Sequence, residues 1–519
     1  MKYSNTALVL LLLPVLTSCG APSEGDPAPD VTQALDAAYE TLDAPGTADV
    51  PPTVDPGIRL RDSGWLRGDL HLHTFFQGGD DGVETVLAVA EYLEDPDFLA
   101  AHPEFLGNGL DFVAITDHRA ASVADDPTFV SDRLILLSGE EFGGPGHAGL
   151  WGITETVDHD PDGDGATLDD YLAAAEAVHA QGGLMSPNHP FLTGNPFGWD
   201  MRTHDAMELI NAGWALGSAD LTAEELDAWE TEHGPASPLF RKAAAHIGGG
   251  GSMQALVYYE AQLARGVHVA LVGGSDRHVL FPVGFPTTWV QAETADTEGV
   301  LAGIRSRRTF VSRTPVAATV ELTVTTPDGS FGVGSRVAWT GEVTLTARTG
   351  RADGGLLRIV TGHAVATDED LEDAALEALV IETEIDGDDF TFEASLEVQP
   401  GDWVYAMVLE PLVAPGLPDE LAMKVPEIAG LAAAAGVEDF DALINIFWDS
   451  MDFTVLLSPA DCDPSLWDPV MTQCMAADDH GIATYYIPDW LDRTFHAWTV
   501  DDQITEWCMG AIASAIVFE

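Results

Sequence analysis

The pattern of hydrophobic and polar residues changes at about residue 314, from strands that alternate with helices to strands alone. In the first part, short apolar runs alternate with helical stretches, which favours an α/β fold with a mainly parallel sheet or barrel. About seven strand–helix units fit a barrel, in which function concentrates at the C-terminal strand ends. The predicted strands are residues 66–73, 112–116, 134–138, 148–153, 184–187, 207–211 and 268–273, and the predicted helices are residues 84–94, 168–181, 223–232, 252–265 and 297–306.

After residue 314 the pattern is that of half-buried strands, because apolar and polar residues alternate with period two. Turn sequences such as Asp328-Gly329 and Asp386-Gly387 separate these strands. We therefore expect an all-β domain of the sandwich type, followed by a helical insertion (426–449) and a loop-rich tail. The predicted strands are residues 316–326, 337–349, 356–361, 378–385, 390–398 and 403–409.

The N-terminus has the composition of an export signal. Lys2 precedes an apolar run over residues 7–16, which is too short to span a bilayer as a mature helix. Residues 16–19 (LTSC) resemble the lipobox of bacterial lipoproteins; an ordinary signal peptide with a chance cysteine is the alternative. The resemblance implies cleavage before Cys19 and acylation of its thiol. With Gly20 next, we expect a lipid anchor in the outer membrane of the cell envelope, with the protein facing the periplasm or the exterior.

Composition sets the number of domains and excludes some partners. The chain has 519 residues, too many for one ordinary domain, and 46% of them are hydrophobic. Its 85 acidic and 21 basic residues give a net charge of −64, which disfavours nucleic acid and anionic membrane surfaces as partners. We expect a signal peptide (1–18), a flexible tether (19–58), the α/β domain (59–314) and the β domain (315–519), whose own partner would be a glycan or a protein.

The cysteines after Cys19 lie near the C-terminus. Cys462 and Cys474 flank a short loop, and an oxidising compartment makes a disulfide between them the default expectation. Cys508 is left over, and we expect it to be buried. Because no two cysteines form a CxxC pair, a zinc–thiolate site is not expected.

The predicted strand at residues 66–73 carries the first candidate chemistry. Its alternation puts Asp69, His71 and His73 on one face and leucines on the other. Two imidazoles at positions i and i+2 can bind one cation, and Asp69 is placed to hold an imidazole N–H from behind. A His-x-His pair by itself is also common on exposed strands, so the interpretation depends on the rest of the chain.

Further potential ligands follow the other predicted strands of the first domain. A barrel would gather these strand ends around one mouth, where the imidazoles and carboxylates would face each other. Such a cluster is costly unless cations hold it together, and its imidazole and carboxylate groups suit Zn, Mn or Fe. The residues are Asp117 and His118 after one strand, Glu140, Glu141 and His147 after the next, His189, and Asp276 with His278.

This ordered set resembles the polymerase-and-histidinol-phosphatase (PHP) superfamily of metallohydrolases, and in particular its carbaryl-hydrolase-like branch. The resemblance covers about residues 65–315 and includes the segment 301–312 (LAGIRSRRTFVS). It implies a distorted (β/α)7 TIM-like barrel, a β-sandwich after it, and two to three divalent transition metals (Zn, Mn or Fe) per chain.

The resemblance also implies which residues would hold each metal. Glu141 would bridge the first two ions, and Glu140 is the alternative, although the Gly-x-Glu spacing of the family favours Glu141. The first ion would be held by His71, His73, Glu141 and Asp276, and the second by Glu141, His147 and His189.

The third ion would be held by His118, His278 and a carboxylate from the loop after His73. Here the sequence departs from the family pattern, which has Ser-Asp-Gly a few residues after the histidine pair. Residues 75–82 (FFQGGDDG) are longer and lack the serine. Asp81, which precedes the glycine, is the candidate ligand, and Asp80 is the alternative.

The metals imply a hydrolytic mechanism in which a water bridging the first two ions loses its proton and becomes the nucleophile. Arg277 and Arg119 adjoin predicted ligands and are candidates to clamp an anionic substrate; ordinary salt bridges are an equal alternative. Asp117 is a candidate for orienting the site or for proton transfer, and capping the turn after it is the alternative.

An acidic stretch offers a second kind of ion site. Residues 158–165 resemble the start of a calcium loop, although Pro161 is awkward in such a loop and an ordinary solvated acidic loop is the alternative. The candidate calcium ligands are Asp158, Asp160, Asp162, Asp164 and Asp169.

Three functions fit these residues. The favoured one is a surface-anchored metal-dependent phosphoesterase that acts on a small-molecule substrate. The second keeps the same site but hydrolyses a carboxylic or carbamic ester, and the third is a non-catalytic surface-binding lipoprotein. Because the chain is so acidic, a small or neutral substrate is easier to attract than a polyanion.

Overall fold

The structure is a computed structural model. It describes residues 64–74, 110–160, 166–192, 195–199, 202, 204–211, 220–246, 250–277, 283–365, 377–414, 422–423, 425, 467–468, 473–474, 476–477, 483–484, 493, 496–500 and 503–519. Residues 58–519 belong to one compact unit. The predicted signal peptide, tether, helix at 84–94, helical insertion and Cys462 lie outside the described residues, so the acylation of Cys19 and the disulfide stay predictions.

The first part of the chain contains buried strands, several of which pair in parallel. Strands β1 (Trp65–Leu72), β2 (Phe112–Ile115) and β3 (Ile135–Phe142) form a parallel set, and β6 (Ala206–Asn211) pairs in parallel with β7 (Ala270–Gly274). All residues of β1, β2, β6 and β7 are buried, as expected for strands of a sheet that is covered on both faces. A side chain at Gly68 would come within 2.2 Å of the Phe112 ring, so this close pairing requires glycine.

The expectation of a mainly parallel barrel is only partly met. Strand β4 (His147–Trp151) runs antiparallel to β3, and β5 (Leu184–Asn188) runs antiparallel to β4. Only residues 143–146 connect β3 to β4, and a parallel crossover needs about a dozen residues or more. The described strands do not form a closed, hydrogen-bonded barrel. The fold is therefore mixed α/β with mostly strands, and the barrel stays a prediction.

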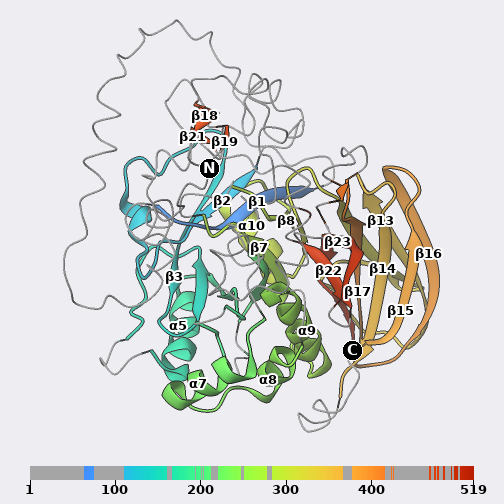
Figure 1. Cartoon of the computed structure of the whole chain (residues 1–519), viewed down its shortest axis with the longest axis horizontal. Helices are drawn as coiled ribbons and strands as arrows, with labels where there is room; N and C mark the ends of the chain where they lie inside the picture. The colour runs from blue at the N-terminus through green and yellow to red at the C-terminus, as the bar shows by residue number, and fades with distance from the viewer. Residues whose placement is uncertain are drawn as a thin grey trace, which may run out of the picture. The chain divides into compact units, whose positions relative to one another are not determined.

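The helices begin and end where local sequence signals place them. Helix α5 (Leu168–Ala180) begins at a capping box in which Thr167 donates to Asp170, and α7 (Ala223–His233) begins at the equivalent pair Thr222 and Glu225. Helix α9 ends just before Gly266, which has φ +82°. The other helices are the 3-10 helix η3 (Ser122–Asp125), α8 (Pro238–Ala244), α9 (Gly250–Ala264) and α10 (Thr297–Arg305) (Figure 1).

The later strands form two sheets that share an apolar core, as the alternating pattern predicts. One sheet has the order β11-β10-β13-β16, and β14 in the other pairs with β15 and β17. Buried side chains from both sheets, such as Val324, Leu345, Ile359 and Ala406, belong to one core. The strands are β10 (Thr319–Thr326), β11 (Gly329–Gly332), β12 (Arg336–Val337), β13 (Gly341–Gly350), β14 (Leu356–His363), β15 (Glu377–Glu384), β16 (Asp389–Val398) and β17 (Asp402–Pro411) (Figure 1).

The pattern missed the strands that join the two parts. β8 (Thr287–Gln291) pairs with β1 and with β9 (Thr309–Ser312), and β9 pairs with β23 (Gln503–Ala513), which also pairs with β17. One sheet thus runs from β5 through β1 to β17, across the predicted boundary at 314/315, which stays a prediction. The remaining strands are β18 (Trp467–Asp468), β19 (Gln473–Cys474), β20 (Ala476–Ala477), β21 (Ala483–Thr484), β22 (Ala497–Val500) and β24 (Ile516–Phe518).

Two smaller observations complete the fold. Cys508 on β23 is buried, as predicted. Among the helices that the structure describes, none is both long and apolar enough to cross a membrane.

Candidate metal centre

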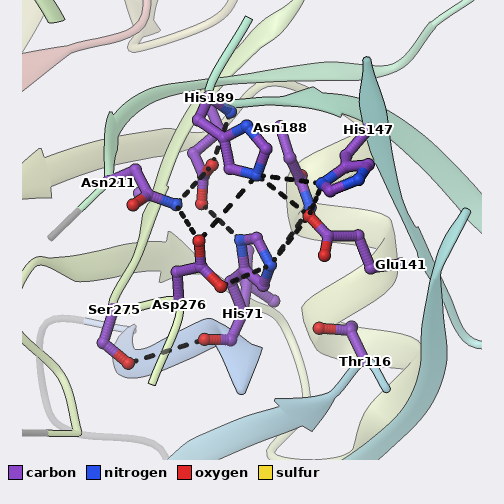
Figure 2. Close-up of polar contacts among 12 residues, drawn as sticks. His71, Thr116, Glu141, His147, Asn188, His189, Asn211, Ser275 and Asp276 are labelled. Atoms are coloured by element: carbon purple, nitrogen blue, oxygen red, sulfur yellow. Dashed lines mark hydrogen bonds and ion pairs between the residues drawn. The ribbon is translucent and has the colours of Figure 1, made fainter. Parts of the chain in front are cut away.

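The ends of the buried strands bring the predicted metal ligands to one place (Figure 2). His71 lies at the end of β1, Glu141 near the end of β3, and Asp276 just after β7. Isolated backbone bridges hold these ends together, one between Leu72 and Arg277 and one between His118 and Glu141. The convergence that the sequence predicted is therefore present, although it arises without a closed barrel in the described strands.

The carboxylate of Glu141 is the centre of the cluster and is buried, with 1% of the residue exposed. Its Oε1 lies 3.1 Å from His71 Nε2, 3.2 Å from His147 Nδ1 and 3.0 Å from His189 Nε2. Its Oε2 lies 2.8 Å from His118 Nδ1 and 3.5 Å from His73 Nε2. Glu141 thus contacts imidazoles on both of its oxygens, which is the geometry that a bridging carboxylate needs.

The donor atoms of the first predicted metal site fit a single cation. One atom each from His71, His73, Glu141 and Asp276 lie within 4.8 Å of one another. Asp276 Oδ1 is 3.3 Å from His71 Nε2 and 3.1 Å from His73 Nε2. With bonds of about 2.0–2.2 Å, neighbouring ligands of one transition metal lie about 3.0–3.5 Å apart. The spacing and the donor types therefore match a Zn, Mn or Fe site.

The predicted ligands of the second ion also lie close together. His118, which was predicted to hold the third ion, lies next to them. His147 Nδ1 is 3.4 Å from His189 Nε2, and both imidazoles contact Glu141. Donor atoms of His118, Glu141 and His147 form another group that could hold an ion. Asp80, Asp81 and His278, the predicted partners of His118 at a third ion, lie outside the described residues.

The ionisable groups of the cluster shift one another's pKa values strongly. Burial would raise the pKa of the Glu141 carboxyl, but the imidazoles of His147, His71 and His118 hold this pKa well below its usual value. Glu141 therefore stays an anion. Burial lowers the pKa of His147. Burial acts the same way on His71 and His189, but the neighbouring carboxylates, Glu141 among them, outweigh it and raise the pKa of both imidazoles.

The neighbouring residue Glu140 is not part of the cluster. Its Oε1 accepts a hydrogen bond from the Val157 backbone N–H at 3.0 Å, and burial raises its pKa to about 7. Successive residues of a strand point to opposite faces, so only one of the two adjacent glutamates can reach the histidines. The structure thus favours Glu141 over the alternative Glu140.

The candidate catalytic residues have different surroundings. Asp117 is buried, and its carboxylate accepts hydrogen bonds from the Thr74 backbone N–H at 2.6 Å and from Thr74 Oγ at 2.7 Å. Arg277 is also buried, and its carbonyl accepts from the His73 N–H at 3.1 Å. Arg119 is exposed, and its Nε donates to the Gly143 carbonyl at 2.9 Å. Of the three side chains, Arg119 is the one exposed to solvent.

Glu208, which was not predicted from the sequence, lies behind an imidazole of the cluster, where Asp69 was expected. Glu208 on β6 lies behind His71, with Oε1 3.0 Å from His71 Nδ1. Asp69 instead accepts backbone N–H groups of His71, Ser275 and Gly284, at 3.1, 3.1 and 2.8 Å. The prediction for Asp69 was therefore wrong, because its carboxylate ties the backbone of β1 to residues 275 and 284 rather than an imidazole.

Buried or half-buried asparagines also surround the cluster without having been predicted. Asn188 Nδ2 donates to Glu141 Oε1 at 3.2 Å, and Asn195 Nδ2 lies 3.0 Å from His147 Nε2. Asn211 Nδ2 donates to Asp276 Oδ2 at 3.3 Å. Asn188 directly precedes a predicted ligand, but nothing in the local sequence distinguishes Asn195 or Asn211 from other loop or strand-end asparagines.

Backbone strain is concentrated near this cluster. Among the described non-glycine residues with positive φ, Asp276 (+49°) and His189 (+25°) are predicted ligands and Arg119 (+56°) follows one. Such conformations cost about 1–3 kcal/mol each and persist where the surroundings enforce them, often at functional sites. The strain is consistent with side chains held in position for binding.

The candidate calcium loop is only partly visible. Asp162 and Asp164 lie outside the described residues, and Asp158 Oδ1 accepts the Asp160 N–H at 3.2 Å. Asp169 lies in the first turn of α5. The calcium site therefore stays a prediction.

No protein-family model and no curated protein matches the chain. One similar solved structure is a two-domain protein from Bacteroides vulgatus ATCC 8482 that contains a predicted PHP-like metal-dependent phosphoesterase. It has 16% identity and a TM-score of 0.32, with 69% of this chain and 95% of that chain covered. A second is PfuEndoQ, a lesion-specific endonuclease from Pyrococcus furiosus, with 14% identity, a TM-score of 0.27, and 46% of this chain and 56% of that chain covered. Since both TM-scores are low, we base the functional proposal on this chain's own residues.

Proposed function

We propose that this protein is a metal-dependent hydrolase of the PHP type and that it most readily cleaves phosphate esters. The observation that carries the proposal is the buried Glu141 carboxylate with imidazoles on both of its oxygens and a second carboxylate, Asp276, beside them. A purely structural core does not need this many titratable groups, because burying them is costly unless they are paired or bind a metal.

The residues of the chain would divide the work as follows. His71, His73, Glu141 and Asp276 would hold one divalent ion, and Glu141, His147 and His189, with His118 adjacent, would hold another. Ions bound there would supply the Lewis acidity that lowers the pKa of water and neutralises charge on a phosphoryl or acyl oxygen. Arg119, exposed beside His118, would bind an anionic group of the substrate. Asp117 would keep Thr74 and the strand ends in position rather than move a proton.

The same ligands would also serve hydrolysis of a carboxylic or carbamic ester, which is the second candidate. An exposed arginine next to the cluster supports the phosphate ester, because a neutral ester offers it no charge to bind. A non-catalytic surface-binding lipoprotein would not need the cluster. We also propose, from the sequence signals alone, that the protein is lipid-anchored through Cys19 at the cell envelope.

The test compares three substrates with the full-length chain loaded with Mn²⁺, Zn²⁺ or Fe²⁺. We expect turnover of bis-p-nitrophenyl phosphate or p-nitrophenyl phosphate to exceed that of an aryl ester, and His189→Ala to abolish it. Turnover of the aryl ester alone would support the second candidate. Absence of bound metal under every loading condition would contradict both.

A further inference from the structure

A buried carboxylate outside the two donor groups contacts the cluster from behind. Glu208 on β6 is 2% exposed, and its Oε1 lies 3.0 Å from His71 Nδ1. Its Oε2 accepts the backbone N–H of His189 at 2.7 Å. Glu208 thus contacts the ring of His71, a predicted ligand of the first ion, and the backbone of His189, a predicted ligand of the second.

A buried amide extends this contact to a further ligand. Asn211 Nδ2 donates to Glu208 Oε2 at 3.0 Å and to Asp276 Oδ2 at 3.3 Å (Figure 2 shows the contact with Asp276). The register of β6 against β7 shifts between Glu208 and Ile210. Regular alternation would place residues 208 and 211 on opposite faces, and the shift lets both side chains reach the same side of the sheet.

The backbone leaves room for this arrangement. A Cβ atom on Gly274 of β7 would come within 2.3 Å of His71 Cβ and 2.8 Å of Glu208 Oε1. Any larger residue at position 274 would therefore push His71 and Glu208 apart. The glycine is needed for the contact between the ring and the carboxylate.

We infer that Glu208 is a positioning residue of the proposed metal centre. Its Oε1 accepts a hydrogen bond from a protonated Nδ1 of His71, and its Oε2 accepts from the His189 backbone N–H and from Asn211 Nδ2. Protonation of Nδ1 leaves the lone pair on Nε2, the atom that faces Glu141 and Asp276. The inference rests on the proposed function, because it assigns Glu208 a task for the same metals.

The substitution Glu208→Gln tests the inference because it keeps the shape of the side chain but leaves only one acceptor oxygen. Mn²⁺ binding to the full-length chain is measured by electron paramagnetic resonance, and Co²⁺ is used for an absorption spectrum of the ligand field. We expect Glu208→Gln to weaken Mn²⁺ binding by about 10–100-fold and to change the Co²⁺ spectrum. The matched control Glu140→Gln replaces a buried glutamate that does not contact the cluster, and it should bind Mn²⁺ like the wild type.

The outcomes separate this inference from the proposed function. Mn²⁺ binding to the wild type, with equal affinity and an unchanged Co²⁺ spectrum for Glu208→Gln, would overturn the role of Glu208 and leave the proposed function standing. No Mn²⁺ binding to the wild type would overturn the proposed function and, with it, this role. If Glu208→Gln does not fold, Asn211→Ser decides: about 10-fold weaker binding supports the role, and unchanged binding overturns it.

Discussion

The strand ends around Glu141 and the strands of the later sheets use buried positions in opposite ways. On β10 and β13, buried and more exposed positions alternate, and the buried side chains are apolar apart from threonines near the strand ends. On β1 and β3, imidazoles and carboxylates are buried together with the leucines. Apolar burial stabilises the fold by itself, whereas a buried charge needs a partner or a ligand. The later sheets therefore mainly stabilise the fold, and the buried polar groups lie in the region that we propose to bind metal.

We expect the largest effect on hydrolysis and metal binding from a substitution at Glu141, the carboxylate at the centre of the buried cluster. Glu141→Gln removes the charge from the carboxylate that all five imidazoles contact, so we expect hydrolysis to fall by about 10³-fold or more and bound metal to fall with it. Glu140→Gln, the adjacent substitution, should leave both nearly unchanged. Activity assays and metal analysis of the two purified variants make the comparison, and equal losses in both would contradict the assignment of Glu141.

Substitutions in the apolar core between the two later sheets should change the stability of the fold rather than metal binding. Leu345→Ala creates a cavity in the core between the two later sheets, where Leu345 is fully buried, and should lower the free energy of unfolding by about 2–5 kcal/mol. The exposed neighbour in Thr344→Ala should change it by only about 0.5 kcal/mol. Denaturant unfolding gives both values. Loss of bound metal in folded Leu345→Ala would show that the two regions are not as separate as proposed.

An imidazole outside the cluster links the two regions and should make the protein sensitive to acid. Burial lowers the pKa of His268 to about 3, and its Nε2 lies 2.8 Å from the Ala515 carbonyl oxygen before β24. In the unfolded chain the His268 imidazole has a pKa of about 6.5 and is protonated below that pH, whereas in the folded chain it stays neutral. The free energy of unfolding therefore falls as the pH drops from about 6.5 towards 3. At pH 5 the loss from this group is about 2 kcal/mol.

The variant His268→Gln keeps a donor for Ala515 but cannot take up the proton. We expect wild type and variant to differ little at pH 7.5, and the variant to lose less stability between pH 7.5 and pH 5. Urea unfolding at the two pH values measures the difference. Parallel loss in both proteins would exclude His268 as the cause.

We expect the smallest effect from a substitution at Arg119, which is exposed beside the buried cluster. Arg119→Ala removes an exposed guanidinium, and we expect KM for a phosphate monoester to rise about 10-fold while kcat changes little. The KM of a neutral aryl ester should stay the same, because it has no anionic group for Arg119 to bind. A similar rise for both substrates would point to a structural role for the hydrogen bond to Gly143.

Local patterns were sufficient for most elements and for the main members of the centre. Period-two alternation predicted the later strands, and apolar runs predicted the buried ones. The histidines and carboxylates after successive strands predicted that His71, His73, Glu141, His147, His189 and Asp276 would meet. Strands β8, β9, β23 and β24 were missed because each pairs with a strand distant in the sequence, and this pairing, rather than composition, defines them. Strand β22, which pairs with the neighbouring β23, was missed as well.

The sequence by itself determined which side chains share a face of a regular strand, because this depends only on the two-residue repeat of the backbone. Only the tertiary structure decided that Glu208, and not Asp69, lies behind His71, that His118 contacts Glu141, and that the sheet continues from β1 into β17. These contacts depend on strand register, and one register shift, as in β6, changes which residue from a distant strand reaches a given side chain.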